Sequence, residues 1–200
     1  PRTRVTELAA RDGASSPDTG HRAPGTGQPH CGSARPVLDA DLVTGRAVHR
    51  LLAHADAHDH VSMLLARIRA DLGADEQMAV GDVEAFARDV VALVQNVWRE
   101  DWLRLALASP RARFEFAIAY RIDDGDVVRV VRGTVDCLVP VEEGLLVLEF
   151  KTGQRRPSHQ RQLDLYVDAV RTIYPGTGVR GHLVYATREP APMTAQTLPI

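Results

Sequence analysis

The spacing of apolar residues changes at Pro110, and this change constrains the fold more than any other feature of the chain. Before Pro110, apolar side chains recur at intervals of three and four residues, as they do along one face of an amphipathic helix. This spacing predicts helices over residues 39–57, about 60–72 and 82–107. After Pro110 the interval shortens to two residues, which is typical of strands with one buried face.

Three strands are predicted in succession after Pro110, followed by a helix and a last strand. RFEFAIAY places Phe114, Phe116, Ile118 and Tyr120 on one face, and the turn DDGD leads into VVRVVRGTVDCLV and then GLLVLEF. A helix over about 158–173 and a strand in GHLVYAT complete the order. This order predicts an α/β fold, in which a mixed sheet with an antiparallel hairpin is flanked by helices and preceded by a helical N-terminal part.

The second and third strands are predicted to form a hairpin that turns at Glu142 and Glu143. On one face of this hairpin Asp136 lies opposite Glu149. A shift of one strand by a single residue would mix apolar and polar side chains, so the pattern favours this register. The other face is wholly apolar and pairs Val135 with Phe150, Cys137 with Leu148 and Val139 with Leu146.

Asp136 and Glu149 bring two negative charges together in this register, with Cβ atoms roughly 4.5–5.5 Å apart. Facing like charges destabilise a sheet unless something compensates for them, and a divalent cation would do so. Mg²⁺ is typically bound by one or two carboxylates together with water and substrate phosphates. Lys151 projects from the same face, two residues after Glu149. The group predicts metal-assisted cleavage of a phosphodiester, in which the lysine orients water or stabilises charge on the phosphate.

Lys151 is the only lysine among the 24 lysine and arginine residues of the chain. A compact ammonium that can exchange protons is not equivalent to a planar guanidinium, so one interpretation is that arginine cannot replace this residue. The alternative is that a lone lysine arises by chance in an arginine-biased sequence. The acidic residue expected opposite Glu149 favours the first interpretation.

Three motifs, GTVDCLV, LVLEFKTG and HQRQLDLY, resemble the C-terminal nuclease domain of the RecB and AddA helicase–nucleases, which belong to the PD-(D/E)xK group. The resemblance covers about residues 40–187 and implies a restriction-endonuclease-like core. Glu149 is a departure, since many of these nucleases have aspartate there, although the group's signature allows either acid. The family's motif residues fall here on His49, Asp136, Glu149, Lys151, Gln162 and Tyr166.

The resemblance also implies roles for these residues. Mg²⁺, for which Mn²⁺ can substitute, would bind to Asp136 and Glu149, with His49 as a further metal ligand or a phosphate contact. Gln162 and Tyr166 would position DNA or the active-site strand. Plainer alternatives exist, because a lone helical histidine is usually just a partly buried side chain and a tyrosine among apolar residues usually belongs to the core. We interpret the histidines of HADAHDH as a solvated helix end. Glu115 is a weaker candidate for approaching the metal.

The segment KTGQRRPSHQR carries four basic residues and no acidic residue. A basic run is usually solvated surface, but beside a metal site it can hold a phosphate backbone. We therefore expect Arg155, Arg156 and Arg161 to contact DNA phosphates rather than bases.

Composition bounds the remaining possibilities. The 200 residues suit one domain, which we place at residues 37–200, after a Gly-, Pro- and Ser-rich linker at residues 1–36. Cys31 and Cys137 are too few for a four-cysteine iron–sulfur cluster and fit a reducing cytoplasm. No apolar run is long enough to span a membrane. The first residue is Pro rather than Met, which indicates a fragment of a longer chain.

These observations predict a Mg²⁺-dependent DNA nuclease, an exonuclease domain of a bacterial helicase–nuclease that acts in double-strand break repair and recombination. The resemblance implies that ATP-dependent motor domains in the same chain feed a single strand to the site, and that the further partner is a second helicase–nuclease subunit. One alternative is a degenerate nuclease fold that serves only as a DNA-binding or interaction scaffold, and another is a stand-alone nuclease without a motor. Intact Asp136, Glu149 and Lys151 argue against the scaffold.

Overall fold

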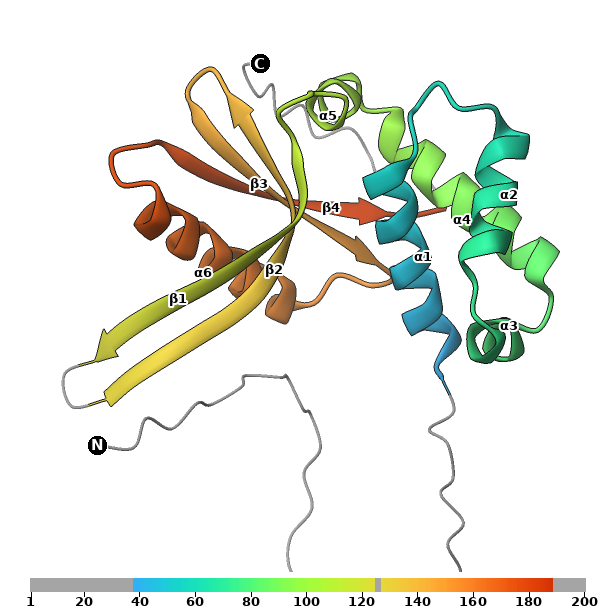
Figure 1. Ribbon diagram of the computed structural model, residues 1–200, viewed down its shortest axis with the longest axis horizontal. Helices are drawn as coiled ribbons and strands as arrows, with labels where there is room; N and C mark the ends of the chain where they lie inside the picture. Colours follow the sequence, from blue (N-terminus) through green and yellow to red (C-terminus); the bar gives the residue numbers. More distant parts are fainter. Residues whose placement is uncertain (1–37, 125–126, 189–200) are drawn as a thin grey trace, which may run out of the picture.

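The structure is a computed structural model that describes residues 38–124 and 127–188 (Figure 1). The predicted linker and Cys31 lie outside these residues. The helices are α1 (Ala40–His54), α2 (Val61–Asp71), α3 (Ala74–Val80), α4 (Val83–Trp98), α5 (Asp101–Leu107) and α6 (Pro157–Ile173). The strands are β1 (Arg113–Asp124), β2 (Val127–Val141), β3 (Gly144–Thr152) and β4 (Val179–Ala186).

The predicted order of helices and strands is confirmed, with two differences in the helical part. The helix expected over residues 82–107 is interrupted between α4 and α5, where Glu100 is the N-cap of α5. The short helix α3 was not predicted from the apolar spacing. None of the described helices combines the length and apolarity needed to cross a membrane.

The four strands form one mixed sheet in the order β1-β2-β3-β4. The pairs β1–β2 and β2–β3 are antiparallel, whereas β3 and β4 are parallel. A parallel pair needs a crossover connection, and α6 provides it. The predicted fold class, an α/β fold with a restriction-endonuclease-like mixed sheet, is therefore observed.

Helices cover both faces of the sheet, so the domain has two cores (Figure 1). The first core lies between the sheet and the N-terminal helices and contains Cys137, Leu148 and Phe150. The second core lies between the sheet and α6, and Val147 and Leu163 are buried in it. Cys137 is a free, buried thiol whose pKa is raised to about 12 by burial, so it is inert.

The predicted hairpin register is confirmed along the ladder that forms, but the predicted pair of Val135 with Phe150 is wrong, because Val135 packs in the second core and Phe150 in the first. Glu142 and Glu143 form the turn, and the ladder runs from Val141–Gly144 to Cys137–Leu148. Gly144 has a φ of 137°, and a Cβ atom there would lie 2.0 Å from the carbonyl oxygen of Gly178, so only glycine fits at the start of β3.

The prediction that apolar residues of β1 and β2 keep to one face is wrong at one point. Phe114 and Cys137 pair with each other and pack in the first core, whereas Phe116 and Val135 pair and pack in the second core. Between these pairs Glu115 has a φ of 50°, in the left-handed region that interrupts the alternation of a strand. Asp136 lies opposite Glu115, at the point where the side chains of β1 and β2 change from facing the first core to facing the second.

Candidate active site

The ladder between β2 and β3 ends at Cys137 and Leu148, one residue before the two acids. Beyond it, carboxylates take the place of backbone partners. Oδ2 of Asp136 accepts a hydrogen bond of 2.7 Å from the amide of Phe150, and Oε1 of Glu149 accepts a longer one of 3.4 Å from the amide of Asp136. Since backbone donors freed from a ladder need acceptors, these bonds explain why the strands can separate here.

The two acids are therefore close, but they do not form the directly opposed ladder pair that the sequence predicted. Glu149 is almost completely buried, with 1% of its side chain exposed. Burial is the main cause that raises the pKa of Glu149 above its ordinary value, and the charge of Asp136 adds to it, while Lys151 opposes both. The pair carries a repulsion that a bound cation would relieve.

His49 connects the acids to the helical layer. From α1, its Nε2 lies 3.0 Å from the carbonyl oxygen of Phe150, and its Nδ1 lies 3.2 Å from Oδ1 of Asp136. Burial lowers the pKa of His49, but the hydrogen bond and the charge of Asp136 outweigh it, so the pKa is raised. In this arrangement both ring nitrogens are engaged with protein atoms.

A close approach of α1 to β3 positions His49. One turn before it, a Cβ atom at Gly45 would lie 3.4 Å from Oγ1 of Thr152, a distance at the tight end of ordinary contact. A larger side chain at Gly45 would push the helix away from the end of β3. The GRAVH segment is thus suited to bringing a histidine against the acids.

Lys151 is held from two sides. Its Nζ donates to Oε2 of Glu149 and to Oε1 of Gln162, each at 3.0 Å, and Nε2 of Gln162 in turn donates to the hydroxyl of Tyr166 at 3.1 Å. Gln162 and Tyr166 are one turn apart on α6. The Gln–x–x–x–Tyr motif therefore orients the lysine through a chain of hydrogen bonds.

Gly133 leaves room for the ring of Tyr166, the last member of these hydrogen bonds, and sequence reasoning missed it. A Cβ atom at Gly133 would lie only 2.7 Å from Cε1 and from the hydroxyl of Tyr166. The ring thus packs directly on the backbone of β2. A glycine inside a strand, three residues before Asp136, is the signal that could have identified this close approach.

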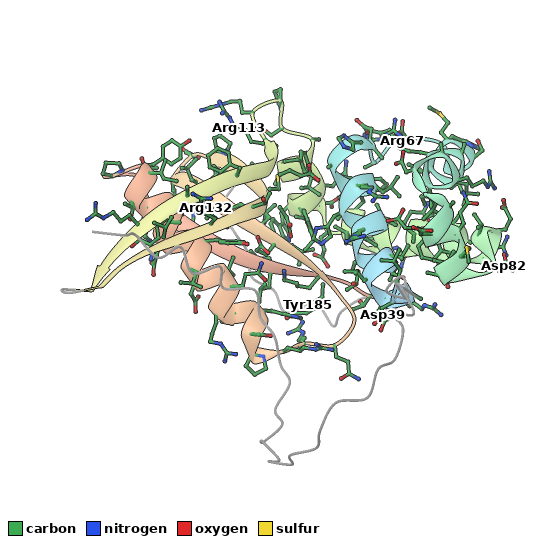
Figure 2. The ribbon with its side chains drawn as sticks, turned by 60° about the horizontal axis from the view of Figure 1, so that its bottom comes forward. Asp39, Arg67, Asp82, Arg113, Arg132 and Tyr185 are labelled. Carbon is green, nitrogen blue, oxygen red and sulfur yellow. The ribbon has the colours of Figure 1, made fainter. Side chains whose placement is uncertain are left out.

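Tyr185, which sequence reasoning also missed, lies beside the start of α6 (Figure 2). The guanidinium carbon of Arg155 lies 4.9 Å from the centroid of its ring, and its hydroxyl lies 3.0 Å from Nδ1 of His159. Arg156 and Arg161, the other predicted phosphate contacts, are exposed on the same end of α6. The parallel pairing of Tyr185 with Lys151 is what places this group next to the lysine.

Two weaker candidates lie apart from this group. The side chain of Glu115 is exposed, although its backbone faces Asp136. His60 caps α2 by accepting from the amide of Ser62 at 3.3 Å, which agrees with a solvated helix end.

The donor chemistry at the acids suits a hard divalent cation. Among the described residues no three His, Cys, Asp or Glu side chains gather as a ready metal cluster. Two carboxylates are nevertheless sufficient for Mg²⁺, which keeps several waters and takes further oxygens from a substrate phosphate. Asp136 and Glu149 thus fit such an ion as a partial site that a phosphate would complete.

Comparison with known proteins finds matches of three kinds. A family model described as the PD-(D/E)XK nuclease superfamily matches residues 29–197. The chain is 28% identical over 159 residues to an ATP-dependent helicase/nuclease subunit from Moorella thermoacetica, in a match that covers 70% of this chain and 11% of that protein. A solved structure, the crystal structure of SSO0001, matches with a TM-score of 0.33 and 19% identity over 72% of this chain and 70% of that one.

Proposed function

Because this chain belongs to the PD-(D/E)XK nuclease superfamily, we propose that residues 37–200 are a Mg²⁺-dependent deoxyribonuclease domain. The observation that carries the proposal is the meeting of Asp136, Glu149 and Lys151 at the point where β2 and β3 separate. Two acids and an ammonium on rigid strands form a site for a cation and a phosphate together. Nucleases of this superfamily typically use divalent metal ions.

Each residue has a distinct role in the proposed reaction. Asp136 and Glu149 hold Mg²⁺, or Mn²⁺ in its place, with His49 either as a third ligand or as the group that orients Asp136. The cation, when bound, supplies Lewis acidity toward the phosphoryl oxygen and lowers the pKa of water. Lys151 donates to the attacking water or to the phosphoryl oxygen on which negative charge develops.

The position of the ammonium is critical for this role, because hydrogen bonds from one fixed donor contribute only when its aim is right. Glu149 and Gln162 accept from Nζ at 3.0 Å each, and an ammonium has three donors. The third donor remains for the water or the phosphate. Gln162 and Tyr166 thus act as positioning residues.

We further propose that the domain is the exonuclease part of a bacterial helicase–nuclease in the cytoplasm, acting in double-strand break repair and recombination. The similarity to the Moorella thermoacetica protein supports this proposal, and the chain spans about 11% of that protein. In such an assembly ATP-dependent motor domains in cis would deliver a DNA single strand, and a second helicase–nuclease subunit would be a partner. The proposed nuclease domain does not include an iron–sulfur cluster.

A degenerate nuclease fold that only binds DNA or another protein is the alternative. Such a fold would have no reason to keep a buried acid beside a second acid at a cost in stability. The raised pKa of Glu149, which burial and then Asp136 cause, marks that cost. We therefore favour an active site, since ionisable groups with strongly perturbed pKa values cluster at functional positions.

The test is cleavage of an end-labelled DNA single strand by the purified chain in Mg²⁺, with EDTA as the blank. Asp136→Asn keeps an acceptor for the amide of Phe150 but removes the charge, so cleavage should fall to the EDTA level while the fold persists. Asp89→Asn, at an exposed acid of α4 that pairs with Arg188, is the matched control and should cut normally. Undiminished cleavage by Asp136→Asn would refute the proposed site.

A further inference from the structure

A shallow groove of ≈ 570 Å³ lies beside the candidate site, between the start of α6 and β4. Arg155, Arg156 and Gln160 line it from α6 and the segment before it, and Tyr185 lines it from β4; none of its described lining residues is acidic. Neither of the two arginines forms an ion pair with a described carboxylate. Two positive charges are thus available to a ligand.

A groove of similar volume, ≈ 560 Å³, at the other end of β4 offers a contrast. Its arginines are already paired within the protein, since Arg171 lies 3.2 Å from Asp168 and Arg180 lies 2.6 Å from Glu143. The two grooves therefore differ in charge, because the arginines of the groove beside the site have no described carboxylate partner.

The ring of Tyr185 contacts two basic side chains at this groove. The guanidinium carbon of Arg155 lies over it, 4.9 Å from the ring centroid, and Nδ1 of His159 lies 3.0 Å from its hydroxyl. The His159 ring itself lies 5.8 Å away, tilted by 38°. An aromatic ring with a guanidinium over it forms a positively charged plate, and unpaired bases stack on aromatic rings and on guanidinium groups.

The plate lies on the same face of the sheet as Lys151. Tyr185 pairs with Lys151 in the parallel ladder, so both side chains leave the sheet on the face that α6 covers. The positive field of the group reaches His159, whose pKa is lowered by burial and then by Lys151 and Arg156. A strand whose phosphate meets Lys151 would therefore have its neighbouring nucleotide over the groove.

We propose that the Arg155–Tyr185 plate and Arg156 form a subsite for one unpaired nucleotide next to the cleaved phosphate, with its base stacked on the plate and its phosphate on Arg156. This inference rests on the proposed nuclease function and adds a base contact to it. It differs from the expectation that Arg155 contacts phosphates only. The subsite accepts any base, because stacking needs only a π-face, and it requires a single strand, because a base within a duplex has no free face.

The test measures binding to two 12-position probes, oligothymidylate and an abasic strand with the same phosphates, by fluorescence anisotropy in EDTA so that nothing is cut. Tyr185→Leu should weaken binding of oligothymidylate by roughly 5- to 150-fold, the range for loss of one stacked base, and leave the abasic probe unchanged. Arg156→Gln should weaken both probes by the same factor.

Two further variants sharpen the result. Tyr185→Phe keeps the ring and loses only the bond to His159, so it should bind oligothymidylate nearly as the wild type does. Arg171→Gln, in the other groove, is the control and should change neither probe. If Tyr185→Leu does not fold by circular dichroism, Arg155→Gln decides the question with the same probes, because the Arg155 side chain is exposed and its loss leaves the core intact.

Wild-type affinity for oligothymidylate by Tyr185→Leu, an equal loss on both probes, or a wild type that binds the two probes alike would each overturn the subsite. Failure of the nuclease function gives a different pattern. In that case oligothymidylate would bind in EDTA with the expected dependence on Tyr185, but the wild type would leave it uncut in Mg²⁺.

Discussion

Replacing Lys151 with arginine tests the central argument about the site, because it keeps the charge and changes only its shape. Nζ of Lys151 lies 3.0 Å from both Glu149 and Gln162, and only 16% of the side chain is exposed. A guanidinium is larger, planar and fixed in the direction of its donors, so it cannot keep both bonds and still present a donor at the same point.

The expected loss can be estimated from these contacts. If the arginine fails to place one donor at the developing charge, the rate should fall by about 10²- to 10³-fold, the scale for removal of one transition-state donor. Asp136 and Glu149 remain in this variant, so metal affinity should change little. The loss should therefore appear in the rate of the chemical step and not in binding.

Single-turnover cleavage at saturating Mg²⁺, with the Mg²⁺ affinity measured separately by calorimetry, separates the two effects. Arg171→Lys is the matched control, because it is the reverse exchange at an exposed position of α6 away from the site and should cut normally. Near-normal cleavage by the Lys151→Arg variant would show that only charge matters here, and that the single lysine of the chain is a compositional accident.

Three further predictions follow from contacts elsewhere. Gly133→Ala should lower the melting temperature and slow cleavage, since overpacking against Tyr166 costs about 1–3 kcal/mol and disturbs the hydrogen bonds to the lysine; an unchanged melting curve would contradict the close approach. Mg²⁺ should raise the melting temperature of the wild type but not of Asp136→Asn, and an equal rise in both would place the ion elsewhere. The hydrogen bond with Arg50 is the main cause that lowers the pKa of Glu76, so this acid stabilises the fold above its unfolded-state pKa and the contribution is lost as the pH falls through the lower folded-state value. Glu76→Gln should thus unfold more easily than the wild type at pH 7, with a difference that shrinks on acidification; urea titrations at pH 7 and pH 3 would reveal a constant difference if the reasoning is wrong.

Much of this architecture follows from local patterns. The switch from helical to strand spacing gave the order of elements, and the apolar pairs of the hairpin gave its register, because burying one face of a strand leaves few alternatives. The same rule failed at Val135 and Phe114. It assumes strict alternation, and the left-handed backbone of Glu115 breaks that alternation without inserting a residue. Glutamate has no marked preference for such a conformation, so nothing in the residue type announced it.

In the candidate site, too, residues that are close in sequence could be predicted, whereas contacts that depend on tertiary packing could not. The acids and the lysine could be predicted because they lie on one hairpin, within residues 136–151. Tyr185 could not, since its proximity to Lys151 depends on which edge of the sheet the last strand joins. The contact between Gly133 and Tyr166 likewise depends on how α6 docks, and single-sequence periodicity carries no information on that docking.

The separation in sequence between the contacts of the site has a consequence for folding. Lys151 and Gln162 are 11 positions apart and Asp136 and Phe150 are 14 apart, whereas the hydrogen bond of His49 to Phe150 closes a loop of 101 positions. Short loops close early and at a small entropic cost, while long ones close late. During synthesis α1 leaves the ribosome well before β3, so the histidine must wait for its acids until almost the whole domain has emerged. A nascent or partly folded chain would therefore lack an assembled site, and nuclease activity would appear only with the completed fold.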